Sequence, residues 1–246
     1  NDLSAGGVIL FWPQGIHLTN YKDALKIDGL FQATKISLGR TVLGTLGTVS
    51  ASAFLGFMFT QEKMWLRKVW YRIIIITMYF NAGIIPWFLT MKNLGLTNNF
   101  WGYILPAIVS PFHIVLTKTF VESIPKELQE AAEIDGASPM TVFLKIVVPL
   151  SRSIMAVMVV FSMVAYWNDW FTALIYLNAD QAPLPLVLRN ILIRSEVSAS
   201  QSSTISGGYA ELNKITEMIK FSSIIVAAAP MLIIYPFVQK YFEQGF

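Results

Sequence analysis

Six polar or aromatic side chains inside the apolar stretches of this sequence could contact a polar solute. They are Asn81, His113 and the unbroken group Trp167, Asn168, Asp169 and Trp170. Amide and carboxylate groups hydrogen-bond hydroxyls, and indole rings pack on the faces of sugar rings while their edges stay hydrated. Polar groups within a membrane segment are expensive, so they mark candidate pathways for a solute.

Each candidate also has a structural interpretation. Asn81 and His113 could make hydrogen bonds between helices, which is the common role of isolated polar groups in membrane proteins. The group from Trp167 to Trp170 could instead belong to an interfacial aromatic belt, with Asp169 extending to water. The sequence leaves both interpretations open.

The motifs of common catalytic and metal sites are absent from the sequence. It contains no G-x4-G-K-[S/T] phosphate loop, and its two histidines, His17 and His113, lie on different segments. With no cysteine, disulfides, thiol catalysis and cysteine-ligated metals are excluded. We therefore expect no catalytic residue, no metal site and no cofactor bound by this chain.

The composition is that of a membrane protein. Hydrophobic residues make up 54% of the 246 residues, charged residues only 13%, and the mean hydropathy is +0.55. Ordinary soluble domains carry about 25% charged residues. The net charge of +3 is small and dispersed, so it does not indicate binding to nucleic acid.

Five apolar stretches predict five membrane-spanning helices within one transmembrane domain that covers residues 1–246. Their approximate bounds are 37–60, 70–91, 101–120, 154–177 and 219–238. Leu10–Pro13 resembles the exit of a further span, so we expect a sixth span to precede residue 1. The predicted fold is an all-α, polytopic membrane helix bundle. Small residues such as Gly47, Ala51, Ser52 and Gly56 predict close helix packing in the first stretch.

The loops predict the orientation of the bundle. Lys63, Arg67, Lys68 and Arg72 cluster within a few residues, which is typical of a cytoplasmic loop. The loop 122–153 is separated from this cluster by two spans and should face the same side. The loop 178–218 should then lie outside, with a short amphipathic surface helix at 182–192 and a flexible serine-rich part after residue 195.

The loop 122–153 predicts two short helices joined at a glycine. Pro125 suits a first helical turn, and good helix formers follow it as far as Asp135. Gly136 is placed to end this helix in a left-handed conformation, and Ser138-Pro139 is a typical start for the next. Because the first helix carries alanines on one face, another surface could approach it closely.

The sequence of this loop resembles a known motif. Its pattern is EAA-x2-DGA-x5-F-x2-I-x2-P, and it resembles the EAA loop of permease subunits of bacterial ABC importers. In that family the loop is a cytoplasmic coupling helix that docks on an ATPase. The resemblance implies that the ATPase-coupling residues are Glu130, Ala131, Ala132, Asp135, Gly136, Ala137 and Phe143. Many relatives have proline where this chain has Ser153.

Further stretches resemble the carbohydrate-uptake branch of these permeases, which is related to the maltose importer. They include residues 77–96, 167–178, 183–192 and 239–246, and the nearest group imports oligosaccharides and polysaccharides, including oligouronides such as alginate. The resemblance implies a location in the bacterial inner membrane. It also implies a second related permease, two ATPase subunits that bind ATP and Mg²⁺, and an external solute-binding protein.

Three alternatives remain open from the sequence. The same architecture could import a peptide, a polyamine or an inorganic anion instead of a saccharide. The chain could be a secondary transporter driven by an ion gradient, which should need a buried carboxylate, and Asp169 is the one acidic residue within a predicted span. A membrane enzyme is the third alternative, although the sequence shows no catalytic constellation.

Overall fold

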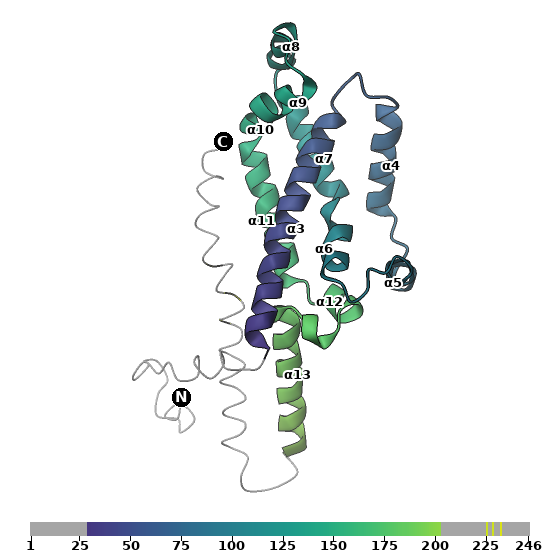
Figure 1. Cartoon of the computed structure of the whole chain (residues 1–246), viewed down its shortest axis with the longest axis vertical. Coiled ribbons are helices and arrows are strands. Elements are labelled where there is room, and N and C mark those ends of the chain that lie inside the picture. Colours follow the sequence, from purple (N-terminus) through teal and green to yellow (C-terminus); the bar gives the residue numbers. More distant parts are fainter. Residues whose placement is uncertain (1–28, 203–224, 226–227, 229–231, 233–246) are drawn as a thin grey trace, which may run out of the picture.

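The structure is a computed structural model that describes residues 29–202 together with Ile225, Ala228 and Leu232. Every regular element among these residues is helical, which agrees with the predicted all-α bundle (Figure 1). The first 28 residues, most of the predicted span 219–238 and the later part of the loop 178–218 lie outside the described residues. The predictions made for those segments therefore stay predictions.

Helix α3, Leu30–Met58, runs through the bundle and contacts α6, α7, α11 and α13. It begins before the predicted start near residue 37, because Leu30 and Ala33 are buried in a cluster with Trp167. The small residues of α3 permit close packing: a Cβ at Gly44 would lie 2.7 Å from the ring of Tyr166. The predicted role of small residues in this helix is thus confirmed.

The second predicted span, 70–91, is not one helix. Helix α4, Arg67–Tyr79, and helix α5, Ile84–Asn93, are bent by 119° relative to each other. Gly83 has a φ of 90°, a conformation that favours glycine, and its N–H donates a 2.9 Å hydrogen bond to Asn81 Oδ1. Pro86 lies in the first turn of α5, where a missing N–H is tolerated. The break replaces the expected continuous span.

The third predicted span, 101–120, corresponds to a pair of consecutive helices. Helix α6, Phe100–Ile108, and helix α7, Pro111–Ser123, together form a 24-residue apolar segment. Asn99 caps α6 by accepting from the Trp101 N–H, and Ser110 caps α7 ahead of Pro111. Pro111 thus begins α7 where the two helices meet, whereas Pro106 lies inside α6, and the segment still counts as one candidate span.

The loop 122–153 contains the two predicted helices joined at Gly136. They are α8, Lys126–Ile134, and α9, Pro139–Val142, which continues through a π-helical turn, Phe143–Val147, into the short α10, Val148–Leu150. The φ of 83° at Gly136 confirms the predicted left-handed junction. Figure 1 shows α8 at the end of the bundle that is remote from α5, α12 and α13.

The fourth predicted span, 154–177, is also interrupted. Helix α11, Arg152–Asn168, ends before Asp169, and the short helix α12, Phe171–Tyr176, follows. After a 3-10 turn at Ala179–Gln181, helix α13 runs over Leu184–Ser202. The prediction of a short surface helix at 182–192 is wrong in two respects. Helix α13 is longer than predicted, and its residues Leu184, Leu186 and Leu188 are buried. The expected flexible stretch is helical as far as Ser202.

Length and apolar character support a membrane location for the described helices. Leu30–Met58 and Phe100–Ser123 are each long and apolar enough to cross a bilayer. Two bent pairs raise the number of such segments to as many as four in the part of the chain that the structure describes. These pairs are Arg67–Tyr79 with Ile84–Asn93, and Pro139–Leu150 with Arg152–Asn168, which are bent by 78°.

Candidate functional site

The loop 122–153 presents one set of its motif residues outward. Helix α8 has no buried residue, and Glu130, Ala131, Asp135 and Gly136 are all exposed. Large apolar side chains are exposed beside them, since Ile134 is 86% and Met140 50% exposed. An exposed surface of alanine, acidic and large apolar side chains at one end of the bundle is suited to docking another protein.

The other motif residues anchor the loop to the bundle. Phe143 is buried, and its ring centroid lies 5.7 Å from that of Phe54 and 5.2 Å from that of Phe57, both on α3. Ala132 and Ala137 pack against the same cluster. The predicted coupling residues therefore divide into an outward set and an anchoring set. The motif spacing alone did not separate the two.

Backbone hydrogen bonds fix the angle between α8 and α9. The Gly136 N–H donates to the Glu133 carbonyl at 3.0 Å, and the Ala137 N–H donates to the Ala132 carbonyl at 2.9 Å. This pattern ends α8 at its left-handed glycine. Ser138 Oγ accepts from the Thr141 N–H at 3.3 Å and so begins α9. The orientation of α8 relative to the segment that holds Phe143 is therefore defined by hydrogen bonds on both sides of Gly136.

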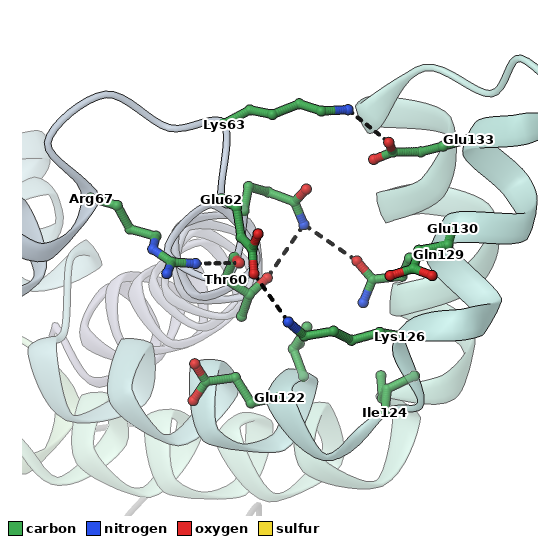
Figure 2. Close-up of a pocket in the computed structure, with 12 residues that line it drawn as sticks. Thr60, Glu62, Lys63, Arg67, Glu122, Ile124, Lys126, Gln129, Glu130 and Glu133 are labelled. Carbon is green, nitrogen blue, oxygen red and sulfur yellow. Dashed lines mark hydrogen bonds and ion pairs between the residues drawn. The ribbon is translucent and has the colours of Figure 1, made fainter.

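A cavity of about 430 Å³ separates α8 from the connection between α3 and α4 (Figure 2). Two ion pairs cross it: Lys63 Nζ lies 2.7 Å from Glu133 Oε2, and Lys126 Nζ lies 3.1 Å from Glu62 Oε1. The hydrogen bond from Lys126 and its positive charge lower the pKa of Glu62. These pairs are exposed, so each adds little stability, yet they hold the connection against α8.

The same contacts test one orientation prediction. The basic cluster that begins at Lys63 was expected to lie on the same side of the bundle as the loop 122–153. Contacts of Glu62 and Lys63 with α8 confirm this, and Gln61 Nε2 also lies 3.4 Å from Gln129 Oε1. Asn81 follows the end of α4 that is remote from α8, and the group from Trp167 to Trp170 lies at the corresponding end of α11. His113 lies in the first turn of α7.

Asp169 forms a buried ion pair that sequence reasoning missed. Arg40, which is 3% exposed within α3, places its Nη2 2.6 Å from Asp169 Oδ2. The guanidinium also donates to the carbonyls of Tyr103, Tyr166 and Asp169 at 3.2–3.4 Å, and it stacks 3.4 Å from the centroid of the Tyr103 ring. Asp169 neither extends freely to water nor offers an unpaired carboxylate.

A signal for this pair is present in the sequence. Arg40 is the one charged residue between Lys35 and Glu62, in the middle of an apolar helix. A buried guanidinium requires an anion and several acceptors. Since Asp169 is the acidic residue within a predicted span, the two could have been paired. The pair joins α3 to the end of α11, while the bonds to carbonyls add α6.

The remaining members of the Trp167–Trp170 group do not form a single site. Trp167 is 4% exposed and packs with Leu30, Leu184 and Leu188, so it belongs to the core. Trp170 is half-buried under the guanidinium of Arg189, 4.1 Å from its ring centroid. Asn168 is exposed. The group thus divides into a core tryptophan, an ion-pair partner and two side chains nearer the surface.

His113 is buried on α7 and lies apart from this group. Its carbonyl accepts from Thr117 Oγ1 at 2.9 Å, and its ring lies edge-on to Phe112. Neither ring nitrogen has a hydrogen-bond partner among the described residues. The hydrogen bond between helices expected from the structural interpretation is therefore not present there.

Asn81 lies at the break between α4 and α5, beside a second cavity of about 590 Å³. This cavity is lined by Thr77, Phe80, Asn81, Ala82, Gly83, Ile84 and Trp87, and by Phe171, Thr172, Ile175 and Tyr176 of α12. Of the six candidate solute contacts, Asn81 is the one that lines it. Within residues 29–202 and the three later described positions, no group of three or more metal-ligating side chains could hold an ion.

The chain matches a family model and curated relatives over most of its length. The family model, described as "Binding-protein-dependent transport system inner membrane component", matches residues 46–246. Protein LplC of Bacillus subtilis (strain 168) is 34% identical over 236 residues, which are 95% of this chain and 78% of LplC. The polygalacturonan/rhamnogalacturonan transport system permease protein YtcP of the same strain is 34% identical over 235 residues, covering 95% and 81%.

A solved structure has the same fold. It is a crystal structure of a bacterial ABC transporter involved in the import of the acidic polysaccharide alginate. The chain matches it with a TM-score of 0.81 and 28% sequence identity, over 95% of this chain and 82% of the other.

Proposed function

Because the chain belongs to the family of binding-protein-dependent transport system inner membrane components, we propose that it is the permease subunit of an ATP-driven importer of oligosaccharides or polysaccharides. Such a subunit resides in the inner membrane and carries its solute without doing chemistry on it. ATP and Mg²⁺ are then bound by partner ATPase subunits, and a solute-binding protein delivers the cargo from outside.

One observation supports the coupling role more than any other: the EAA loop has an exposed face and a buried anchor. The exposed face of α8 carries Glu130, Ala131 and Asp135, where an ATPase can dock. The anchor is Phe143 against α3, the helix that extends toward the opposite end of the bundle. We assign Glu130, Ala131, Asp135 and Gly136 to the ATPase contact, and Ala132, Ala137 and Phe143 to holding the loop.

A saccharide is favoured as the solute by the relatives. The name of one relative includes polygalacturonan and rhamnogalacturonan, and the similar solved structure is of a transporter involved in the import of alginate. An acidic oligosaccharide of the oligouronide type is therefore our first candidate. The working unit would pair this chain with a second related permease, two ATPases and a binding protein.

The structure disfavours the ion-coupled alternative on physical grounds. A transporter driven by an ion gradient needs a carboxylate that can bind and release its ion. Asp169, the candidate for that role, is held by Arg40 at 2.6 Å and also accepts from the Thr172 N–H at 3.0 Å. A carboxylate so committed is a structural group.

The test is ATP hydrolysis by the whole assembly in proteoliposomes, with the binding protein loaded with candidate saccharides. Gly136→Ala strains a left-handed backbone, at a cost of about 1–2 kcal/mol. Gly95→Ala is the matched control, since Gly95 also has a positive φ, of 67°, and both glycines have open space around a Cβ.

We expect loaded binding protein to stimulate hydrolysis in the wild type and in Gly95→Ala, and stimulation to fall in Gly136→Ala. An assembly without a co-purifying ATPase would overturn the importer assignment. So would hydrolysis indifferent to the binding protein and to Gly136→Ala.

A further inference from the structure

Two helix breaks lie at a similar depth in this subunit. Counted from the end of the bundle that carries α8, α4 extends for 13 residues and α11 for 17 residues before they break. At 1.5 Å per residue these are about 20 Å and 25 Å. Both lengths are shorter than a hydrocarbon core of about 30 Å, so both breaks lie within the membrane-spanning part of the subunit.

Non-helical backbone within a membrane leaves N–H and C=O groups without helical partners, which is costly in hydrocarbon. It is tolerated where it is buried in protein or lines a water-filled cavity, and in transporters broken helices mark solute sites. Phe80 is extended, and Gly83 has a φ of 90° and a ψ of 172°. The cavity of about 590 Å³ lies at this break, and its other wall is α12, which follows the second break. Its volume is within the range of about 300–1,000 Å³ typical of ligand sites.

The lining has the chemistry of saccharide recognition. Phe80, Trp87, Phe171 and Tyr176 supply aromatic rings, which pack on the apolar faces of sugar rings. The side-chain oxygen of Asn81 accepts from the Gly83 N–H, and its amide group can still donate to a solute hydroxyl. No charged side chain lines the cavity among the described residues. Such a lining contacts sugar hydroxyls and ring faces and leaves any carboxylate of an acidic sugar to other groups.

The buried ion pair supports one wall of this cavity. While Asp169 Oδ2 is held by Arg40, its Oδ1 accepts from the N–H of Thr172, a lining residue, at 3.0 Å. The first turn of α12 is thereby fixed against α3. The wall is preorganised, which lowers the cost of binding a solute.

We propose that this cavity, between Asn81 and Trp87 at one break and α12 at the other, is a saccharide-contacting site of the subunit. The proposal rests on the proposed function and specifies it, since it places one sugar ring of the cargo against Trp87 and Asn81. Neither residue is in the buried core, so their substitution leaves the packing of α3, α7 and α11 in place.

The experiment uses the full importer in proteoliposomes and measures two quantities side by side. These are uptake of labelled oligogalacturonide, alginate oligosaccharide and maltotriose per ATP hydrolysed, and hydrolysis stimulated by the loaded binding protein. The variants are Trp87→Ala, Trp87→Phe and Asn81→Leu. Ala82→Trp is added because it fills the cavity without removing a contact. Trp101→Ala is the matched control, since Trp101 is 52% exposed against 45% for Trp87 and does not line the cavity.

We expect Trp87→Ala and Asn81→Leu to lower uptake per ATP by about three- to tenfold, the size of one lost ring contact or hydrogen bond. Ala82→Trp should lower it at least as much. Stimulated hydrolysis should stay within about twofold in all three variants, Trp87→Phe should recover most of the uptake, and Trp101→Ala should match the wild type.

Unchanged uptake per ATP in both Trp87→Ala and Ala82→Trp would overturn the site. An equal loss in Trp101→Ala, or a parallel loss of uptake and hydrolysis that Trp87→Phe does not relieve, would also overturn it, because either would indicate a structural effect. A wild-type importer that takes up none of the saccharides is a different result, since it overturns the proposed function itself.

Discussion

Replacing Asp169 with asparagine should destabilise the bundle by leaving a buried cation without its anion. The guanidinium of Arg40 is 3% exposed, and its Nη2 lies 2.6 Å from the carboxylate. Removing one partner of a buried ion pair costs about 3–5 kcal/mol. Two features reduce this figure here: Asp169 is 23% exposed, and Arg40 keeps three carbonyl acceptors and the ring of Tyr103. We therefore expect a loss of about 2–3 kcal/mol in the free energy of unfolding.

A double-mutant cycle separates the pair from its surroundings. Asp169→Asn retains an oxygen that can accept from the Thr172 N–H, so the variant removes charge and little else. Arg40→Met keeps an apolar side chain against Tyr103 and Tyr166. The Asp169 carboxylate, which then has no cationic partner, is partly exposed and can still reach water. The double variant buries no charge, so it should be more stable than the sum of the single losses predicts, by about 1–2 kcal/mol.

The measurement is reversible unfolding in mixed micelles of a mild detergent and dodecyl sulfate, followed by tryptophan fluorescence. Trp167 and Trp170 flank Asp169 and should report the local change. If Asp169→Asn unfolds within about 0.5 kcal/mol of the wild type, the pair does not stabilise the bundle. Additive losses in the double variant would equally refute the reasoning, because they would mean that Arg40 and Asp169 are not coupled.

Three further outcomes are expected from other parts of the structure. Gly56→Val should destabilise the α3–α7 contact by about 1–3 kcal/mol in the same unfolding assay, because a Cβ there would lie 2.7 Å from the Cβ of Thr117. Gly47→Ala should cost less, because its Cβ would lie 3.0 Å or more from the Ile108 side chain. Phe143→Ala should cost about 3–5 kcal/mol and reduce ATP hydrolysis stimulated by the binding protein, although the exposed face of α8 is unaltered. Because Lys126 lowers the pKa of Glu62, their contact contributes above the ordinary pKa of a glutamate and is lost as the pH falls through the lowered value. Limited proteolysis of residues 60–67 should therefore accelerate at acidic pH, and Lys126→Met should show the faster cleavage already at neutral pH.

Sequence patterns predicted those parts of the fold that depend on local chemistry. The left-handed turn at Gly136 and the proline start of α9 follow from backbone preferences, and the structure has both. The segment from Phe100 to Ser123 is long and apolar enough for its sequence to predict a membrane span, despite its prolines. In each case the determining residues lie within a few positions of the feature they determine.

The parts that were predicted wrongly depend on contacts between distant segments. Hydropathy cannot show that the spans at 70–91 and 154–177 are broken, because residues on both sides of each break are apolar. It also cannot show that Trp167 is buried, since its partners Leu30 and Leu184 come from segments outside the predicted spans. The candidate solute contacts were chosen by residue type, and tertiary packing then assigned each of them to a different environment.

Helix α3 connects the two parts of this subunit for which we propose functions, the EAA loop and the cavity beside α12. At one end its Phe54 and Phe57 receive Phe143 of the coupling loop, and toward the other its Arg40 holds Asp169 and, through Asp169, the first turn of α12. From residue 40 to residue 57 is about 25 Å of helix. Continuous helix carries displacement better than interrupted helix, and α3 is unbroken over its 29 residues whereas the α4–α5 and α11–α12 segments are interrupted. A movement of the ATPase contact should thus reach the cavity beside α12 through α3. The broken helices supply the irregular backbone that a solute site needs.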